Sequence, residues 1–218
     1  MQFFKKKKIH YPDFWYAYED TFKQKQTADL KDIRFVVLDT ETTGFDYGED
    51  RMLSMGALSL KDNTIAVGDS FEVYLDQYFY HAKNVEIHGI LRDERKIRVT
   101  ELEALQKFLA FVGNSVIVAH HAGFDITMIN CALRRHGMPK LLNKVLDTSN
   151  LYKRTLIQSP LLKKKEQYSL DELADKFDIS KRDRHTALGD TYITAIAFIK
   201  ILEKLKKKGK FSVKKLLK

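Results

Sequence analysis

The sequence has little cysteine and no long apolar run, and both features narrow the class of protein. Its 218 residues include a single cysteine, Cys131, which excludes an internal disulfide and a cysteine-based zinc cluster. No stretch approaches the roughly 20 apolar residues that a membrane span needs. The N-terminal lysines are followed by no apolar segment, so we expect no signal peptide. We therefore expect a cytoplasmic protein without a membrane partner.

Positive charge is plentiful, but it is concentrated at the two ends of the chain. The formal net charge is +9, and it arises from Lys5–Lys8 and from the lysines of residues 201–218. Such ends could bind the phosphate backbone of a nucleic acid without reading its sequence, or could simply aid solubility. We predict an N-terminal aromatic helical extension over residues 1–30, a main domain over 31–206 and a basic tail over 207–218.

The apolar pattern predicts an α/β protein built on a mixed five-stranded sheet with flanking helices. The run from Phe35 to Leu38 is continuously apolar, as in a central strand that is buried on both faces. The other predicted strands are 52–60, 65–75, 116–119 and 144–147. The predicted helices are 11–22, 100–112, 125–136, a short one through Tyr152, 169–177 and 186–205.

The first predicted helix carries an aromatic stripe. Its five aromatic side chains recur at helical spacing after Pro12, and they are Tyr11, Phe14, Trp15, Tyr18 and Phe22. Such a stripe most simply docks an extra helix onto the core, although stacking on bases or binding of a partner stays open.

Two carboxylates close the buried strand, in the motif VLDTETTG. Asp39 and Glu41 are two positions apart, so they project from the same face of the strand. Carboxylates held side by side repel each other and raise each other's pKa unless a cation lies between them. Mg²⁺ and Mn²⁺ prefer such oxygen ligands. The motif indicates a metal site, although Asp-X-Glu also arises by chance in a chain with 29 acidic residues.

Two further motifs bring acidic residues to the beginnings of helices. VAHHAGFD ends at Asp125, after a predicted strand, and HTALGD carries His185 and Asp190 at the start of the last helix. The helix dipole alone favours an acid in a first turn, so neither motif is decisive by itself. Gly189 costs about 1 kcal/mol relative to alanine inside a helix, which predicts the close approach of another element.

Taken together and in this order, the three motifs resemble those of the DEDDh 3′→5′ exonucleases, the family that includes the proofreading epsilon subunit of bacterial DNA polymerase III. The resemblance extends from about residue 33 to 202. It includes four segments between the acidic motifs, which are RMLSMGALSL (51–60), IHGI (87–90), LDTSNLYKR (146–154) and YSLDELADKF (168–177). The resemblance implies a ribonuclease H-like fold, with residues 31–206 as the exonuclease domain.

The resemblance implies catalysis with two metal ions, Mg²⁺ or Mn²⁺. Asp39 would bridge the ions, Glu41 and Asp190 would complete the site on the side of the nucleophile, and Asp125 would hold the other ion. His185 would be the general base that takes a proton from the attacking water. The residues themselves also require cations, because four converging carboxylates would otherwise repel one another.

The resemblance also implies contacts with the terminal nucleotide from Thr42, Met55, His88 and Gly89. His88-Gly89 could equally be an ordinary turn at the end of a helix. The chain departs from many relatives at His121, where they have asparagine. This imidazole could replace the hydrogen bonds of the amide or could face solvent.

The expected substrate is a single-stranded 3′ end, of DNA rather than RNA, in proofreading or repair, with a DNA polymerase as partner in the first case. Three alternatives stay open. An RNA 3′-exonuclease would use the same residues, because sugars are distinguished by contacts to the 2′-hydroxyl. A non-catalytic adaptor would explain the aromatic helix and the basic tail. A zinc hydrolase could use His120, His121 and His185, but the spacing of zinc ligands is lacking.

Overall fold

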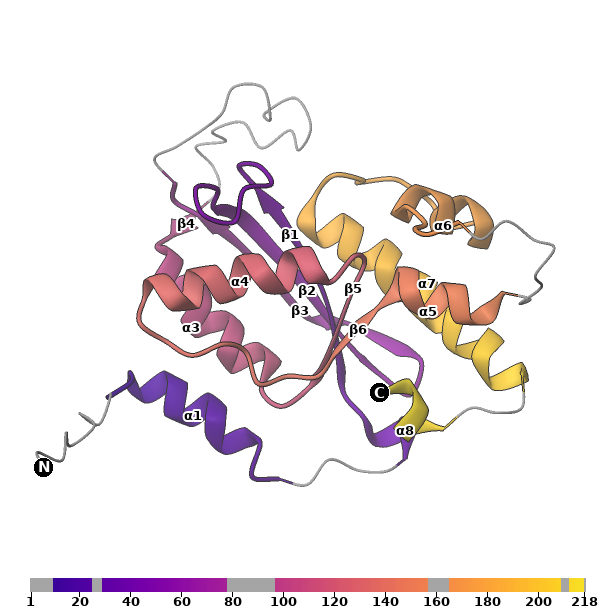
Figure 1. The fold of residues 1–218 in the computed structure, drawn as a ribbon, viewed down its shortest axis with the longest axis horizontal. Coiled ribbons are helices and arrows are strands. Elements are labelled where there is room, and N and C mark those ends of the chain that lie inside the picture. Colours follow the sequence, from indigo (N-terminus) through magenta and orange to yellow (C-terminus); the bar gives the residue numbers. More distant parts are fainter. Residues whose placement is uncertain (1–9, 25–28, 78–96, 157–164, 209–211, 218) are drawn as a thin grey trace, which may run out of the picture.

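A six-stranded mixed sheet forms the centre of the molecule (Figure 1). The structure, a computed structural model, describes residues 10–24, 29–77, 97–156, 165–208 and 212–217. The strand order is β4-β3-β2-β1-β5-β6; β2 is antiparallel to β1 and β3, and the other pairs are parallel. The strands are β1 (Phe35–Thr42), β2 (Met52–Lys61), β3 (Thr64–Leu75), β4 (Arg98–Val99), β5 (Val116–Ala119) and β6 (Val145–Asp147).

The predicted α/β class is confirmed, and the sheet has one strand more than the five expected. The additional strand, β4, has only two residues, too few for an apolar alternation to be visible in the sequence. In the described part of the chain, the helices are α1 (Asp13–Thr21), the 3₁₀ turn η1 (Leu30–Asp32), α3 (Glu101–Val112), α4 (Gly123–Arg135), α5 (Thr148–Thr155), α6 (Leu170–Phe177), α7 (Ala187–Lys207) and α8 (Val213–Leu216).

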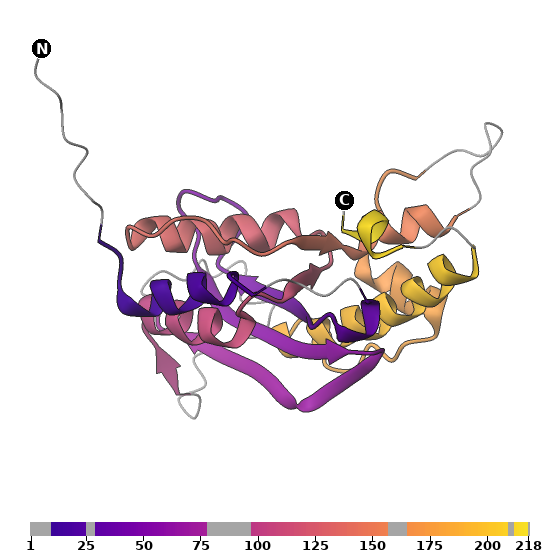
Figure 2. The same ribbon diagram turned by 90° about the horizontal axis from the view of Figure 1, so that it is seen from below.

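Strand β1 is buried on both faces because helices cover the sheet from two sides (Figures 1 and 2). Phe35 and Val37 pack into the core beneath α5, α6 and α7. Val36 and Leu38 point the other way, into the core beneath α1, α3 and α4. By the same alternation, Asp39 continues the face that α7 covers. The acidic end of β1 therefore lies against α7.

Helix α1 docks onto the core, as the aromatic stripe predicts. Trp15 and Tyr18 are buried, with exposed fractions of 1% and 2%, in the cluster that also contains α3. The Tyr18 hydroxyl donates a hydrogen bond to Asn143 Oδ1 at 2.6 Å. Burial raises the pKa of Tyr18 to about 12. The aromatic residues therefore stabilise the fold rather than form an open stacking surface.

The basic tail also contacts the main body in part. The short helix α8 buries Leu216 in the same core cluster as α7 and β1. The tail therefore folds back onto the main domain at this point. The division into an extension, a domain and a tail stays a prediction. Among the described residues, no helix is both long and apolar enough to cross a membrane.

Candidate active site

Three carboxylates converge where β1 ends. Ligand oxygens of Asp39, Glu41 and Asp190 all lie within 4.8 Å of one another. The first two come from β1, and Asp190 comes from the first turn of α7. The pairing of β1 with β2 shifts register between Glu41 and Thr42, so the strand changes direction at the cluster.

The N-terminus of α7 reaches the cluster because two glycines let backbones approach closely. A Cβ atom at Gly56 of β2 would lie 2.5 Å from the backbone carbon of Ala187. A Cβ atom at Gly189 would lie 2.6 Å from Thr186 Oγ1 and would also meet the carbonyl of Asp183. The predicted close approach at Gly189 is therefore confirmed, by the turn that precedes the helix.

Asp125 approaches the cluster from the other face of the sheet. The backbone N–H and the hydroxyl of Thr40 both donate to Asp125 Oδ1, at 3.0 Å and 2.7 Å. Thr40 lies between Asp39 and Glu41, so its side chain points toward α4 while theirs point toward α7. Asp125 is buried, with 4% of its surface exposed. The strand end thus links acids from two helices on opposite faces.

Burial and mutual repulsion make this cluster unfavourable when its members are ionised. The pKa of Asp39 lies well above its usual range, first because of burial and then because of Asp125, Asp190 and Glu41. Burial also raises the pKa of Glu41 and of Asp125 to about 7. Burial raises the pKa of Asp190, while the guanidinium of Arg184 opposes this rise. The all-carboxylate donor set fits a hard divalent cation, which would remove the repulsion.

Without metal, the protein should lose stability as the pH rises from about 4 to about 7. In the folded state Glu41 and Asp125 keep their protons up to about pH 7, whereas the same groups ionise near pH 4 when unfolded. The folded state binds more protons in this interval, so the free energy of unfolding falls with rising pH, by on the order of 2 kcal/mol after solvent screening. Urea denaturation in EDTA at several pH values measures this change, and a constant or rising stability would contradict it.

Of the three histidines that lie in the motifs, one is exposed and the other two lie side by side. His185 is exposed, just before α7, and its backbone N–H donates to Asp190 Oδ1 at 3.3 Å. The ring centroids of His120 and His121 lie 4.3 Å apart. Burial lowers the pKa of His120 to about 4, and its Nδ1 lies 2.8 Å from Thr148 Oγ1. Within the described residues, no set of three metal-ligand side chains that includes a histidine converges as the carboxylates do, which leaves the zinc alternative unsupported.

The structure places the residues predicted to contact the terminal nucleotide in different surroundings. Thr42 lies at the end of β1, where its hydroxyl donates to the carbonyl of Gly44 at 2.8 Å. Met55 lies in the core with 0% of its surface exposed, so it offers no surface to a ligand, and we leave it out of the proposed contacts. His88 and Gly89 lie outside the described residues.

An exposed aromatic group around Phe124 was not predicted from the sequence. Phe45 is 79% exposed and Tyr47 is 42% exposed, and their ring centroids lie 5.6 Å and 5.8 Å from that of Phe124. Phe124 immediately precedes Asp125. A phenylalanine in a turn directly after Thr-Gly was the signal in the sequence, since a large apolar side chain in such a turn cannot be covered by the turn itself.

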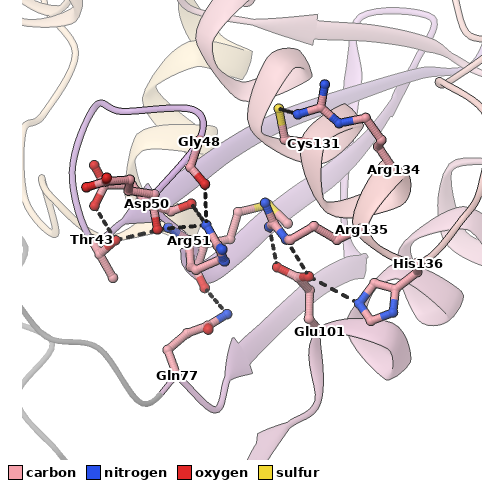
Figure 3. A network of polar contacts seen from close by, with 12 residues as sticks. Thr43, Gly48, Asp50, Arg51, Gln77, Glu101, Cys131, Arg134, Arg135 and His136 are labelled. Atoms are coloured by element: carbon pink, nitrogen blue, oxygen red, sulfur yellow. Dashed lines mark hydrogen bonds and ion pairs between the residues drawn. The ribbon is translucent and has the colours of Figure 1, made fainter.

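Polar contacts hold this loop in a fixed shape (Figure 3). The hydroxyl of Thr43 donates to Asp50 Oδ1 at 2.6 Å, and the backbone N–H of Thr43 donates to the carbonyl of Arg51 at 2.9 Å. Arg51 Nη1 in turn donates to the carbonyls of Gly48, Glu49 and Asp50. The exposed aromatic side chains are therefore presented by a braced loop.

Sequence comparisons identify relatives over most of the chain. The model of the exonuclease family (RNase_T) matches residues 36–198. The chain is 35% identical over 181 residues to the DNA polymerase III subunit epsilon of Aquifex aeolicus, which covers 83% of this chain and 86% of that protein. It is also 35% identical over 182 residues to the PolC-type DNA polymerase III of Caldanaerobacter subterraneus, of which the match covers 12%. This chain thus spans only a small part of the length of the PolC-type relative.

Solved structures share the fold. Exonuclease I of E. coli in complex with a dT13 oligonucleotide superposes with a TM-score of 0.68 at 16% identity, over 81% of this chain and 42% of that one. Exonuclease X in complex with 5′-overhanging duplex DNA superposes with a TM-score of 0.61 at 19% identity, over 84% of this chain and 97% of that one. Together with the sequence matches, the predicted resemblance is confirmed, and the chain belongs to the exonuclease family.

Proposed function

We propose that the protein is a metal-dependent 3′→5′ exonuclease that releases nucleoside 5′-monophosphates from the 3′ ends of DNA. The observation that supports this most is the convergence of Asp39, Glu41 and Asp190 within 4.8 Å, in surroundings that disfavour their ionisation. A protein that only binds a partner has no need of such a cluster, which is costly without a cation. Membership of the exonuclease family supports the same conclusion.

The proposed roles follow from where each side chain lies. Two ions, Mg²⁺ or Mn²⁺, when bound, would stabilise the charge that develops on the phosphate. Asp39, Glu41, Asp125 and Asp190 would hold them. The two hydrogen bonds from Thr40 keep Asp125 in place. The exposed ring of His185 would accept a proton from the attacking water, and the chain would leave one nucleotide shorter.

The relatives support DNA as the substrate and a DNA polymerase as the partner. One matched protein is named as a PolC-type DNA polymerase III and another as a DNA polymerase III subunit epsilon, and the two solved exonucleases are described in complexes with DNA. We propose that the chain acts on single-stranded DNA ends, in proofreading or in repair. RNA trimming is the second candidate, because the same carboxylates would serve either sugar.

A time course with matched 5′-labelled DNA and RNA oligomers tests this proposal. With Mg²⁺ or Mn²⁺ we expect a ladder of products that shorten from the 3′ end, faster for DNA, and no cleavage in EDTA. Faster cleavage of RNA would show that RNA is the substrate and would leave the proposed mechanism unchanged. Absence of cleavage of both oligomers would refute the proposed exonuclease activity. On duplex substrates, a preference for a mismatched over a paired 3′ terminus would favour proofreading over general repair.

Replacing Phe45 with alanine should weaken the binding of single-stranded DNA by about 5- to 150-fold, since stacking contributes about 1–3 kcal/mol per base. Its ring is 79% exposed and lies 5.6 Å from that of Phe124, the residue before Asp125, so we propose that a base near the 3′ end stacks on it. Fluorescence anisotropy with a labelled oligomer in EDTA measures the affinity without turnover. As a control, Val67→Ala removes another exposed apolar side chain, on β3, and should leave the affinity unchanged. Equal affinities of Phe45→Ala and the parent would rule out the stacking role.

A further inference from the structure

Arg184 holds a position in the site that neither the motifs nor the proposed catalytic roles explain. Its guanidinium connects two helices. Nε and Nη2 donate to the carboxylate of Asp171 in α6, at 2.9 Å and 3.4 Å, and Nη1 donates to Asp190 Oδ2 in α7 at 2.5 Å. The Arg184 side chain is 19% exposed and that of Asp190 is 8% exposed. A positive side chain thus engages one of the three converging carboxylates directly.

The turn before α7 is shaped to point this side chain inward. Asp183 and His185, on either side of Arg184, both have left-handed backbone angles, with φ of 65° and 66°. Residues other than glycine adopt this conformation at a cost, which the surrounding packing must offset. The carbonyl of Asp183 packs over Gly189, and the N–H of Arg184 donates to the carbonyl of Lys181 at 3.2 Å. The direction of the guanidinium is therefore set by the backbone.

The charge of Arg184 acts on the whole cluster. It lowers the pKa of Asp39, Glu41 and Asp190, in each case against the rise that burial causes. It therefore partly supplies the positive charge that the carboxylates need. A divalent cation bound by Asp190 would lie close to this guanidinium, and two positive charges at such short range repel strongly in a partly buried site.

We propose that Arg184 is a built-in counter-cation that occupies Asp190 while the metal is absent, yields this carboxylate to the metal, and is then retained by Asp171 alone. Asp171 suits this role because it already accepts two hydrogen bonds from Arg184 and is half exposed, so it can keep the pair when Asp190 turns away. The exchange keeps the cluster folded without metal and sets a threshold for metal binding. It rests on the proposed metal site of the exonuclease.

Calorimetric titration with Mn²⁺ in the absence of nucleic acid tests the exchange. Arg184→Gln removes the competing charge and should tighten Mn²⁺ binding by about tenfold or more. The same variant should melt at a lower temperature than the parent in EDTA, and the difference should shrink in Mn²⁺. Arg182→Gln is the matched control, because Arg182 is an exposed arginine of the same turn, and its Mn²⁺ affinity should equal that of the parent. Unchanged or weaker Mn²⁺ binding by Arg184→Gln would overturn the proposal.

A double-mutant cycle tests the role of Asp171 separately. Asp171→Asn should weaken Mn²⁺ binding, because the displaced guanidinium then has no second partner. In the Arg184→Gln background the same change should have little effect, since Asp171 acts through Arg184. Equal effects of Asp171→Asn in both backgrounds would refute the retention by Asp171. If the parent itself bound no Mn²⁺, the proposed metal site would be wrong, whereas a parent that binds and an unresponsive Arg184→Gln would refute only the exchange.

Discussion

Replacing Asp39 with asparagine should reduce exonuclease turnover by roughly 10³-fold or more, the effect of losing several kcal/mol of charge stabilisation in the transition state. Asp39 lies in β1, and its carboxylate is repelled by the other three acids of the site. Asp125, Asp190 and Glu41 all raise its pKa in addition to the effect of burial. Turnover of a labelled oligomer with saturating Mn²⁺ measures the loss.

The same substitution should stabilise the protein in EDTA, and this opposite sign separates a metal ligand from a structural residue. Asparagine keeps the shape of the side chain and removes the cost of either protonating the buried carboxyl group or ionising it beside its neighbours. We expect a higher melting temperature than that of the parent in EDTA and no further rise on addition of Mn²⁺. Asp62→Asn, in the exposed turn between β2 and β3, is the control and should change neither quantity. A variant that is both inactive and less stable in EDTA would show that Asp39 supports the fold instead.

Replacing His185 with alanine should slow turnover by about 10²- to 10⁴-fold while leaving Mn²⁺ affinity near that of the parent. His185 is exposed just before α7, and its contact with the carboxylate of Asp190 is made by its backbone N–H. The side chain is therefore placed for proton transfer rather than for ligation. Single-turnover rates and calorimetry on the same preparation measure the two quantities.

Chemical rescue distinguishes a general base from a residue that shapes the loop. Imidazole added to His185→Ala should restore part of the rate if the missing group only accepts a proton. His136→Ala is a suitable control, since His136 pairs with Glu101 in a separate network with Arg135 (Figure 3). An His185→Ala variant as active as the parent would refute the general-base assignment, and weakened Mn²⁺ binding would assign the ring to the metal.

The elements that could be predicted from the sequence are those whose signal is local. The four apolar residues that begin β1 are buried on both faces, so the sequence shows a continuous run there. The helix predicted over 169–177 is present as α6, and Ser169 and Glu172 form a capping box with both of its hydrogen bonds at its start. Strand spacing was also sufficient to place Asp39 and Glu41 on one face. Periodicity thus placed these two acids side by side, and the resemblance to the exonuclease family assigned them to the metal site.

The parts that could not be predicted depend on contacts between distant segments. Met55 lies in a segment that resembles the family in sequence, yet it is fully buried in the core cluster beneath α1, α3 and α4. The exposure of Phe45 depends on how Asp50 and Arg51 fold the loop. The pairing of Arg184 with both Asp171 and Asp190 requires α6 and α7 to be placed first, so no spacing rule could indicate it.

The docking of α1 gives the protein an optical reporter of its own. Trp15 is the single tryptophan of the chain, and it is sealed between α1 and the core with 1% of its surface exposed. Its emission therefore reports whether the N-terminal helix is seated, without any attached dye. Because the chain has no other tryptophan, a change in this emission can be assigned to the seating of α1 and not to another tryptophan at the carboxylate cluster.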